Sequence, residues 1–297
     1  MKKSIVFFVI LLTLTAMLLA GCSAIFHTSG TGQIVEKTYD FKDFTNVEIS
    51  DACRYDIQQS DNYSIVASGH EYVIERMDIQ QSGNTLSIGI KFIPFISISD
   101  TRITITMPQL SKLSVTGACD GKATGFVSNG DLDINISGAS GLDADFKAGT
   151  TKLVLSGDSN ITGNLTAANT QIRLSGASDL NMTMQTGNMV ITASGSSDIR
   201  GSLQAADCQF NLSGASTCNI SGAAGKTIIA ASGASEMDSP GLALQTADVK
   251  LTGASDASIH VNGTLNVDIS GASTLNYSGN PSMGKIEISG SSDLNHK

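Results

Sequence analysis

The chain of 297 residues contains no tryptophan, and aromatic residues make up only 5% of it. Carbohydrate-binding proteins often stack sugars on aromatic rings, so this scarcity argues against a glycan site without excluding one. Basic residues are also few: 18 Lys and Arg stand against 27 Asp and Glu, which gives a net charge of −9. Nucleic acids and anionic lipid surfaces attract positively charged proteins, so we expect neither as a partner of this chain.

Motifs for catalysis and metal binding are missing as well. The four histidines are scattered, and no Cys-x-x-Cys, His-x-x-His or Gly-x-Ser-x-Gly sequence occurs. We therefore predict a non-enzymatic protein with no catalytic residues, no cofactor and no metal site. One enzyme class remains an alternative, the parallel β-helix lyases and hydrolases of polysaccharides. These enzymes gather Asp, Arg or Lys on one sheet face, and no such cluster falls within one or two adjacent repeats of this chain.

Residues 1–21 resemble the signal peptide of a bacterial lipoprotein. Lys2 and Lys3 precede an apolar run that is short for a membrane span, and the sequence Leu19-Ala20-Gly21-Cys22 resembles a lipobox. Such signals are cut before the cysteine, so Cys22 is the predicted lipidation site. Ser23 follows it instead of aspartate, which in a Gram-negative cell favours the outer membrane. An ordinary cleaved signal with an incidental cysteine is the alternative.

A repeat dominates the rest of the chain. The sequence Ser-Gly-Ala-Ser or a close variant returns at steps of 18 to 21 residues, with its glycine at positions 117, 138, 157, 176, 195, 214, 233, 253, 271 and 290. Fixed periods of this size are typical of repeat architectures.

Within each repeat the apolar residues alternate. They lie four and two residues before the glycine and four residues after it, as in Ile172, Leu174 and Leu180 around Gly176. A period of two predicts strands with one buried face, and we expect two short strands per unit that meet at the glycine. Turn-forming residues such as 147–150, 185–188 and 261–264 predict a second turn. One unit cannot bury its apolar face alone, so the predicted fold is an all-β, parallel β-helix-like solenoid with one ~19-residue repeat per coil.

The serine two residues after each glycine has the parity of the buried positions. A buried hydroxyl needs a hydrogen-bond partner, and stacked serines can bond to one another or to the backbone at the bend. We interpret this row as structural, because a nucleophilic serine needs an adjacent base and no histidine recurs beside it. The next residue is often acidic or polar, as in Asp179, Asp198 and Asp256. A weak calcium site is possible there, but a solvated edge is the favoured interpretation.

Four segments follow from these patterns: the signal peptide at 1–21, a tether at 22–35, an N-terminal β module at 36–110 and the repeat solenoid at 111–297. The module is expected to cover the first end of the solenoid, since exposed coil ends are sheet edges. Its expected strands are residues 35–41, 47–58, 63–67, 77–81, 85–90 and 102–107, with hairpin turns at 60–62 and 82–84.

One piece of the module matches a degenerate repeat with Asp51 at the glycine position. Cys53 and Cys119 then occupy equivalent places, two residues after Asp51 and Gly117. If the two units stack, the cysteines come within disulfide range. Two buried free thiols are the favoured alternative.

Four features together resemble the bacterial DUF2807 family, the autotransporter adhesin head GIN domain: a lipoprotein signal, an N-terminal β module, the sequence Thr104-Ile105-Thr106-Met107-Pro108-Gln109-Leu110 and tandem Ser-Gly-Ala-Ser units. The resemblance covers residues 36 to 295. It implies a β-solenoid fold and a cell-envelope location, and it brings no catalytic residues.

The outward residues before each glycine are the expected binding face. We expect Lys152, Arg173 and Lys250 to share one outward row there, among small polar residues. Such a surface has no deep apolar pocket, so an extended polymer, a glycan or a partner protein of the envelope fits it better than a small molecule. The hypothesis is a lipid-anchored adhesin or other binding or structural module of the cell envelope.

Overall fold

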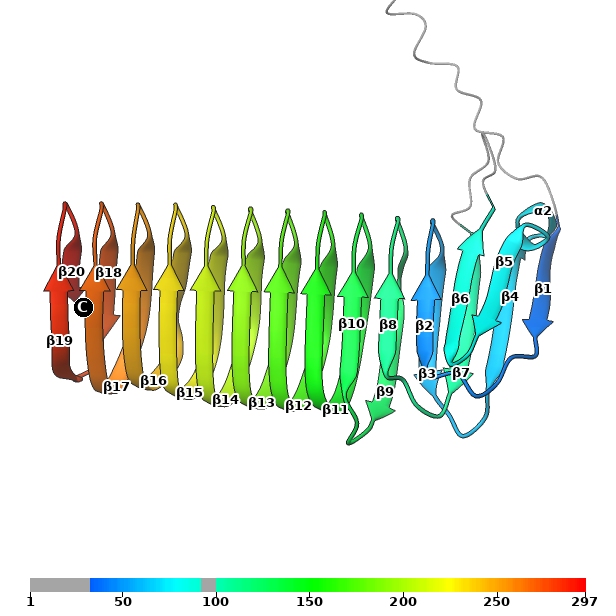
Figure 1. The fold of residues 1–297 in the computed structure, drawn as a ribbon, viewed down its shortest axis with the longest axis horizontal. Helices are drawn as coiled ribbons and strands as arrows, with labels where there is room; N and C mark the ends of the chain where they lie inside the picture. Colours follow the sequence, from blue (N-terminus) through cyan, green and yellow to red (C-terminus); the bar gives the residue numbers. More distant parts are fainter. Residues whose placement is uncertain (1–32, 92–99) are drawn as a thin grey trace, which may run out of the picture.

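The computed structural model describes residues 33–91 and 100–297, which form a long rod built almost entirely of β-strands (Figure 1). The predicted signal peptide, the predicted lipidation site Cys22 and most of the predicted tether lie outside the described residues. Among the described residues, no helix is long and apolar enough to cross a membrane.

The repeats form the predicted β-solenoid. Every coil pairs in parallel with the next coil at an offset of one repeat, so that Asn160 pairs with Asp179 and Leu174 with Ala193. The strands of this region are β8 (Lys112–Val115), β9 (Asp120–Val127), β10 (Leu132–Ile136), β11 (Gly141–Leu155), β12 (Asn160–Leu174), β13 (Asp179–Ala193), β14 (Asp198–Leu212), β15 (Thr217–Ala231), β16 (Glu236–Leu251), β17 (Asp256–Ile269), β18 (Thr274–Ser278), β19 (Ser282–Ile288) and β20 (Asp293–His296).

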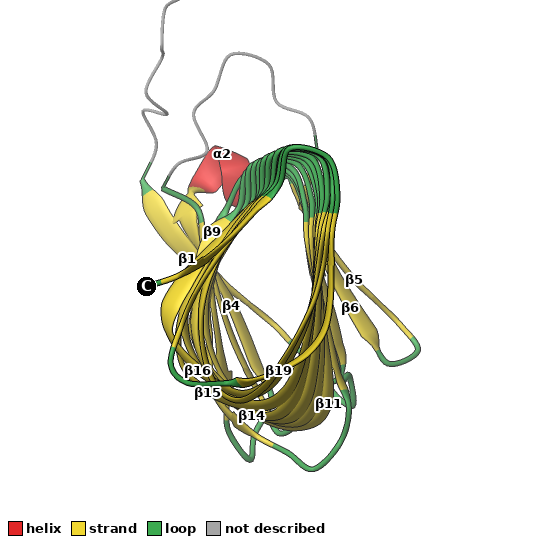
Figure 2. Ribbon diagram, turned by 90° about the vertical axis from the view of Figure 1, so that its left-hand side faces the viewer, coloured by secondary structure: helices red, strands yellow, loops and turns green. Residues whose placement is uncertain are grey.

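The second turn of each coil differs from the prediction. In the middle coils, one strand of about 15 residues runs from one Ser-Gly-Ala-Ser bend to the next and curves at the far end of a flattened oval (Figure 2). Residues 147–150 and 185–188 therefore lie inside β11 and β13. Glycine is needed at position 187 because a Cβ there would lie 2.5 Å from the Ala168 carbonyl oxygen of the preceding coil. The buried alternation restarts at this curve, with Thr186 and then Met189 facing inward.

The bend glycines form a column in the left-handed region of backbone space. Their φ angles run from +73° at Gly214 to +96° at Gly117. Each carbonyl accepts a hydrogen bond from the residue after the glycine of the next coil, as in Ala215 N–H to Gly195 at 2.8 Å. A Cβ on Gly214 would lie only 2.6 Å from the Gly195 oxygen. Glycine is thus required both by the dihedral angle and by the contact.

The serines of the bend are buried, as predicted. Ser216 is 0% exposed, and its Oγ donates to the Ser213 carbonyl oxygen at 2.8 Å. The same bond to the carbonyl three residues earlier recurs at Ser159, Ser178, Ser197, Ser235, Ser255 and Ser273. The hydroxyls thus fix the bend and are not free to act as nucleophiles. The apolar positions on both sides of the glycine fill one continuous core along the rod.

The N-terminal region begins with β1 (Ile34–Tyr39), β2 (Asn46–Ile49), β3 (Arg54–Gln59), β4 (Ser64–His70), α2 (Glu71–Ile74), β5 (Met77–Ser82), β6 (Thr85–Ile90) and β7 (Arg102–Met107). The expected strand at 47–58 is thus divided into β2 and β3. Between them Asp51 adopts φ +78° and its carbonyl accepts the Ala118 N–H at 2.6 Å. This confirms that Asp51 takes the glycine position of a degenerate coil. β2 and β3 extend the ladder through β8 and β9.

The stacking brings two cysteines together. Cys53 Sγ lies 3.7 Å from Cys119 Sγ, and both are buried free thiols. Their hydrogen bond and their burial raise the pKa of the Cys53 thiol. Cys208 and Cys218 are buried free thiols elsewhere in the core, and burial raises the pKa of each to about 12.

Antiparallel strands finish the first end of the rod. β4 pairs antiparallel with both β7 and β1, and β5 pairs antiparallel with β6 across the predicted turn at 82–84. The turn at 60–62 does not close a hairpin, because β7 lies between β3 and β4. The short helix α2 was not expected from the sequence.

Two glycine-to-alanine substitutions test the stacked bend. Gly214 and Gly125 have φ of +73° and +79°, but nothing lies within 4 Å of the Cβ position at Gly125. Gly125→Ala should cost only the left-handed conformation, about 1–2 kcal/mol. Gly214→Ala must also displace a carbonyl of the neighbouring coil and should cost about 1–3 kcal/mol more. Urea unfolding of both variants measures the difference, and equal free energies of unfolding would contradict the stacked bend.

The core also predicts a stabilising substitution. Thr227 is fully buried, and its hydroxyl has no hydrogen-bond partner among the described residues. Thr227→Val keeps the shape and removes the unsatisfied group, so it should stabilise the protein by about 1 kcal/mol. Thr170 is its control, because Thr170 Oγ1 donates to Thr186 Oγ1 at 3.1 Å. Thr170→Val should cost about 0.5–1.5 kcal/mol. Melting temperatures that shift in the same direction for both variants would refute this account.

Candidate functional site

The coils present two broad sheet faces. Face A consists of the strand segments that follow each bend glycine, and face B consists of the segments that precede it. Along each strand, every second side chain points into the core and the others point to solvent. Because the coils stack in register, equivalent outward side chains form rows that run along the rod. Neighbouring members of a row are one strand spacing apart, about 4.8 Å. Each row therefore forms a line of regularly spaced groups.

The predicted binding residues lie on face B, and all three are exposed. Arg173 and Lys250 share one row, with three coils between them, so they are about 19 Å apart. Lys152 does not share it. Val154 pairs with Arg173, whereas Lys152 pairs with Gln171 in the adjacent row. The expectation of one common row is wrong, because Lys152 precedes its glycine by five residues and not by three.

Two of these cations have acidic neighbours. Lys250 Nζ lies 2.8 Å from Asp268 Oδ2, and Lys152 Nζ lies 3.8 Å from Asp133 Oδ2. Exposed ion pairs contribute little to stability, since water screens them and both side chains lose freedom. The pairs therefore leave the lysines available to an incoming charged ligand. Face B is a mixed-charge surface and not a basic patch.

A shallow hollow of about 260 Å³ lies on face B near the last coils. Ile228 contributes apolar surface to it and is 37% exposed, while Lys250, Asp268, Lys285 and Glu287 form charged walls. Sequence reasoning missed this feature. The signal was present in the adjacent pair Ile228-Ile229, because two consecutive apolar residues on a strand cannot both face the core.

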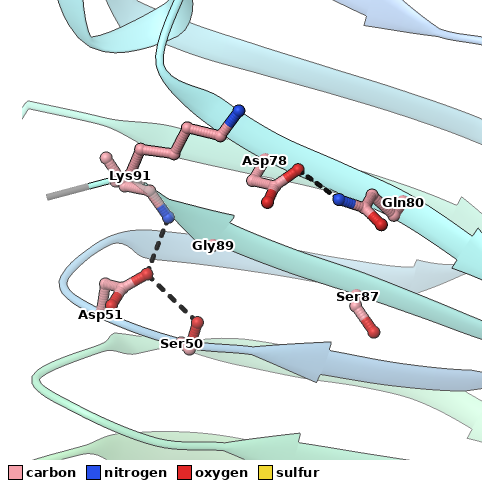
Figure 3. A pocket seen from close by; sticks show the side chains of 8 residues that line it. Ser50, Asp51, Asp78, Gln80, Ser87, Gly89 and Lys91 are labelled. Carbon is pink, nitrogen blue, oxygen red and sulfur yellow. Dashed lines mark hydrogen bonds between the residues drawn. The ribbon is translucent and has the colours of Figure 1, made fainter.

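A more polar hollow of about 370 Å³ lies beside the degenerate coil (Figure 3). Its carboxylates are occupied by structural bonds. Asp51 Oδ2 accepts the Ile90 backbone N–H at 2.7 Å and the Ser50 hydroxyl at 3.2 Å, and Asp78 Oδ1 accepts from Gln80 Nε2 at 2.6 Å. Asp51 thus ties the end of β6 to the first bend of the solenoid.

A third hollow of about 290 Å³ lies on face A where the module meets the solenoid. Arg54, Arg102 and Lys122 bring positive charge to it, but Asp120 and Asp143 line it as well. Lys122 is paired with Asp56 at 3.3 Å. Below this surface the Tyr55 hydroxyl donates to the Gly141 carbonyl oxygen at 2.7 Å, and burial raises the pKa of Tyr55. The balance of charge gives no preference for an anion or a cation.

The outward row that follows the bend serines holds the acidic residues considered for calcium. Gly141 interrupts it, and the Asp120 and Asn160 side chains close over that gap. Asp198 accepts hydrogen bonds from Thr217 and Arg200. In the described part of the chain, no group of three or more His, Cys, Asp or Glu residues is arranged to hold a metal ion.

Three solved structures resemble this fold over 91% of the chain. They are described as a putative adhesin from Parabacteroides merdae (TM-score 0.59, 16% identity, 98% of that chain covered), a putative adhesin from Parabacteroides distasonis (0.53, 16%, 99%) and a "putative lipid binding protein" from Parabacteroides distasonis (0.51, 15%, 98%). At these identities the likeness establishes the fold alone. A search of the curated proteins found no match.

The sequence profile of one family matches residues 43–186 and 181–281, which together span most of the chain. That profile is described as "Putative auto-transporter adhesin, head GIN domain". The description agrees with a protein of the cell surface or envelope. The chain belongs to the DUF2807 family.

Proposed function

We propose that the chain is a lipid-anchored, non-enzymatic adhesin of the cell envelope that binds an extended polymer or partner protein along face B. The observation that carries the proposal is the outward surface of the solenoid. Its rows repeat at every coil, they are rich in small polar side chains, and mixed charges are spread along them. A linear or flat partner can make many weak contacts with such rows.

The alternative of a β-helix enzyme has less support. Glycoside hydrolases use a pair of carboxylates at the bond they cleave, and the buried bend serines, which donate their hydroxyls to backbone carbonyls, do not supply such a pair. The cations of face B are divided between two rows and several coils, which does not concentrate charge at one point. Asp, Arg and Lys side chains do gather at the third hollow, on face A, so a β-helix enzyme would have its site there. Cleavage of an envelope polysaccharide by the purified protein would overturn the non-enzymatic interpretation.

The lipid anchor is proposed from the lipobox-like sequence at Leu19–Cys22. With the solenoid anchored near its first end, the rod projects away from the membrane and exposes face B along its length. The outer membrane is the proposed location in a Gram-negative host, because Ser23 and not aspartate follows the cysteine.

Reversing the charge of face B tests the binding surface. The triple variant Lys152→Glu, Arg173→Glu and Lys250→Glu should fold normally, because the three side chains are exposed, and should bind isolated envelope fractions at least about tenfold more weakly. The matched control carries the same change in net charge on face A, at Lys122, Lys147 and Arg200, which are also exposed. Pull-down and circular dichroism measure both. If the two triple variants bind alike, face B is not the functional surface.

Replacing the predicted lipidation site tests the anchor. In cells, Cys22→Ser should move the protein from the membrane fraction to the soluble fraction and abolish labelling by a clickable fatty acid. Cys53→Ser is the control, since that thiol is buried in the core and should leave both readouts unchanged. Membrane association of Cys22→Ser equal to that of the unsubstituted protein would rule out the anchor.

A further inference from the structure

The two ends of the rod are finished differently. Antiparallel strands cover the first end, whereas the last coil, β19 and β20, retains the geometry of the repeat. β19 pairs with β17, β20 pairs with β18, and no strand among the described residues pairs with their other edges. Open edges of this kind are templates for pairing with another chain.

The side chains of this last coil are as apolar as the core. Ile286 and Ile288 are 45% and 47% exposed, although Val267 and Ile269, their partners in the preceding coil, are buried. Met283 is also exposed, and Leu294 is only half-buried. Side chains at the core positions of the repeat are thus exposed to solvent at this end, beside an unpaired strand edge.

The backbone of this edge is available for bonding. The N–H groups of Ser289, Ser291 and Asp293 donate to carbonyls of the preceding coil at 2.7 to 3.0 Å, and Lys297 does so at 2.9 Å. Along a strand, successive N–H and C=O groups point to opposite sides. The backbone groups of Ile286, Ile288 and Leu294, which alternate with these residues, therefore point away from the rod.

The charges beside this edge are complementary to a second copy of the same edge. Lys285 and Glu287 lie on one side of β19 as an exposed ion pair, with Nζ to Oε1 at 2.8 Å, and hydrogen bonding to Glu287 raises the pKa of Lys285. In an antiparallel pairing centred on Ile286, each Lys285 lies opposite the Glu287 of the other copy. Ile286 then meets Ile286 of the other copy.

The other strand of the last coil allows the same symmetry. An antiparallel pairing of β20 centred on Asn295 places Asp293 opposite Lys297 of the other copy. Ile286 lies four residues before the Gly290 bend and Asn295 five residues after it. A single two-fold axis, perpendicular to both faces of the oval, can therefore pass through both pairing centres and relate β19 and β20 to their copies at once. Opposite charges across a strand pair stabilise it, and like charges destabilise it.

From these observations we propose that two copies of the chain join end to end through β19 and β20, with a two-fold axis at Ile286. The pairing extends both sheets across the contact and covers Met283, Ile286, Ile288 and Leu294. It is isologous, so it closes as a dimer and does not propagate. A head-to-tail contact would instead continue into a filament, but it would join the repeat geometry of the last coil to the antiparallel strands β1 and β4 at the first end of the rod.

The contact also has a consequence for adhesion, which rests on the proposed lipid anchor. The N-terminal strand β1 lies at the end of the rod opposite to β19 and β20 (Figure 1). A tail-to-tail pair therefore carries its two anchors at its outer ends. Such a pair joins two facing membranes rather than neighbours on one membrane, and the partner in adhesion is then a second copy of this chain.

Charge exchange across the proposed axis tests the dimer. The mature chain, residues 22–297 with Cys22→Ser, is examined by analytical ultracentrifugation and light scattering. The unsubstituted edge should give a dimer. Lys285→Glu places two glutamates opposite each other at two points, and Glu287→Lys does the same with lysines, so each should weaken dimerisation at least about tenfold. An equimolar mixture of these two variants restores opposite charges and should dimerise again, as should the double variant.

Lys147→Glu makes the same charge change on an exposed site of β11 and should leave the dimer unaffected. A monomer at every concentration overturns the proposal, and so do filaments or a mixture that does not dimerise. Clustering of vesicles that carry the lipidated chain, abolished by Lys285→Glu, tests the contact between membranes. Dimers of the mature chain without vesicle clustering would leave the edge contact standing and refute its role between membranes.

Discussion

The structure depends on the contact between one bend glycine and the next. Each glycine is in the left-handed region, and its carbonyl oxygen accepts an N–H from the bend of the following coil at 2.7 to 2.8 Å. A Cβ on a bend glycine would overlap the carbonyl oxygen of the bend in the preceding coil. The glycine column therefore sets the distance and the register between coils, and the buried serine beside it fixes the shape of each bend. The apolar core follows, because the register places equivalent residues of successive coils on top of one another.

The same constraint explains which features of the fold the sequence predicts. The glycine period, the buried serines and the alternating core are visible because every coil repeats them. Asp51 could be recognised as a glycine equivalent, since aspartate is among the few residues that tolerate positive φ. The curve at Gly187 was misjudged as a turn. Gly187 accommodates a carbonyl of the neighbouring coil inside a continuous strand, and a single sequence does not distinguish a crowded glycine from a turning one.

The surface was harder to predict, because repetition gives no information about it. Outward residues vary from coil to coil, and their neighbours are known only when the register is known to the residue. An offset of two residues was enough to place Lys152 in the wrong row. The hollow near Ile228 depends on residues from four successive coils, and the charged residues around it come together only after the coils stack. The family resemblance predicts the fold and the broad location. It does not predict the binding partner, which must be inferred from the surface.

At each end of the rod, a coil lacks a neighbour that would cover its apolar side chains and pair with its strand edges. In solenoid proteins a terminal repeat needs a polar outer surface or a cap to remain soluble. The first end meets this need with antiparallel strands and α2. The last described coil does not, since it keeps the serines of the bend and also keeps Ile286 and Ile288 at core positions. An apolar coil end with free backbone groups is costly in water. In the proposed dimer, the end of a second rod covers this surface. That end has the same strand spacing and curvature, and it presents its charges in the reverse order.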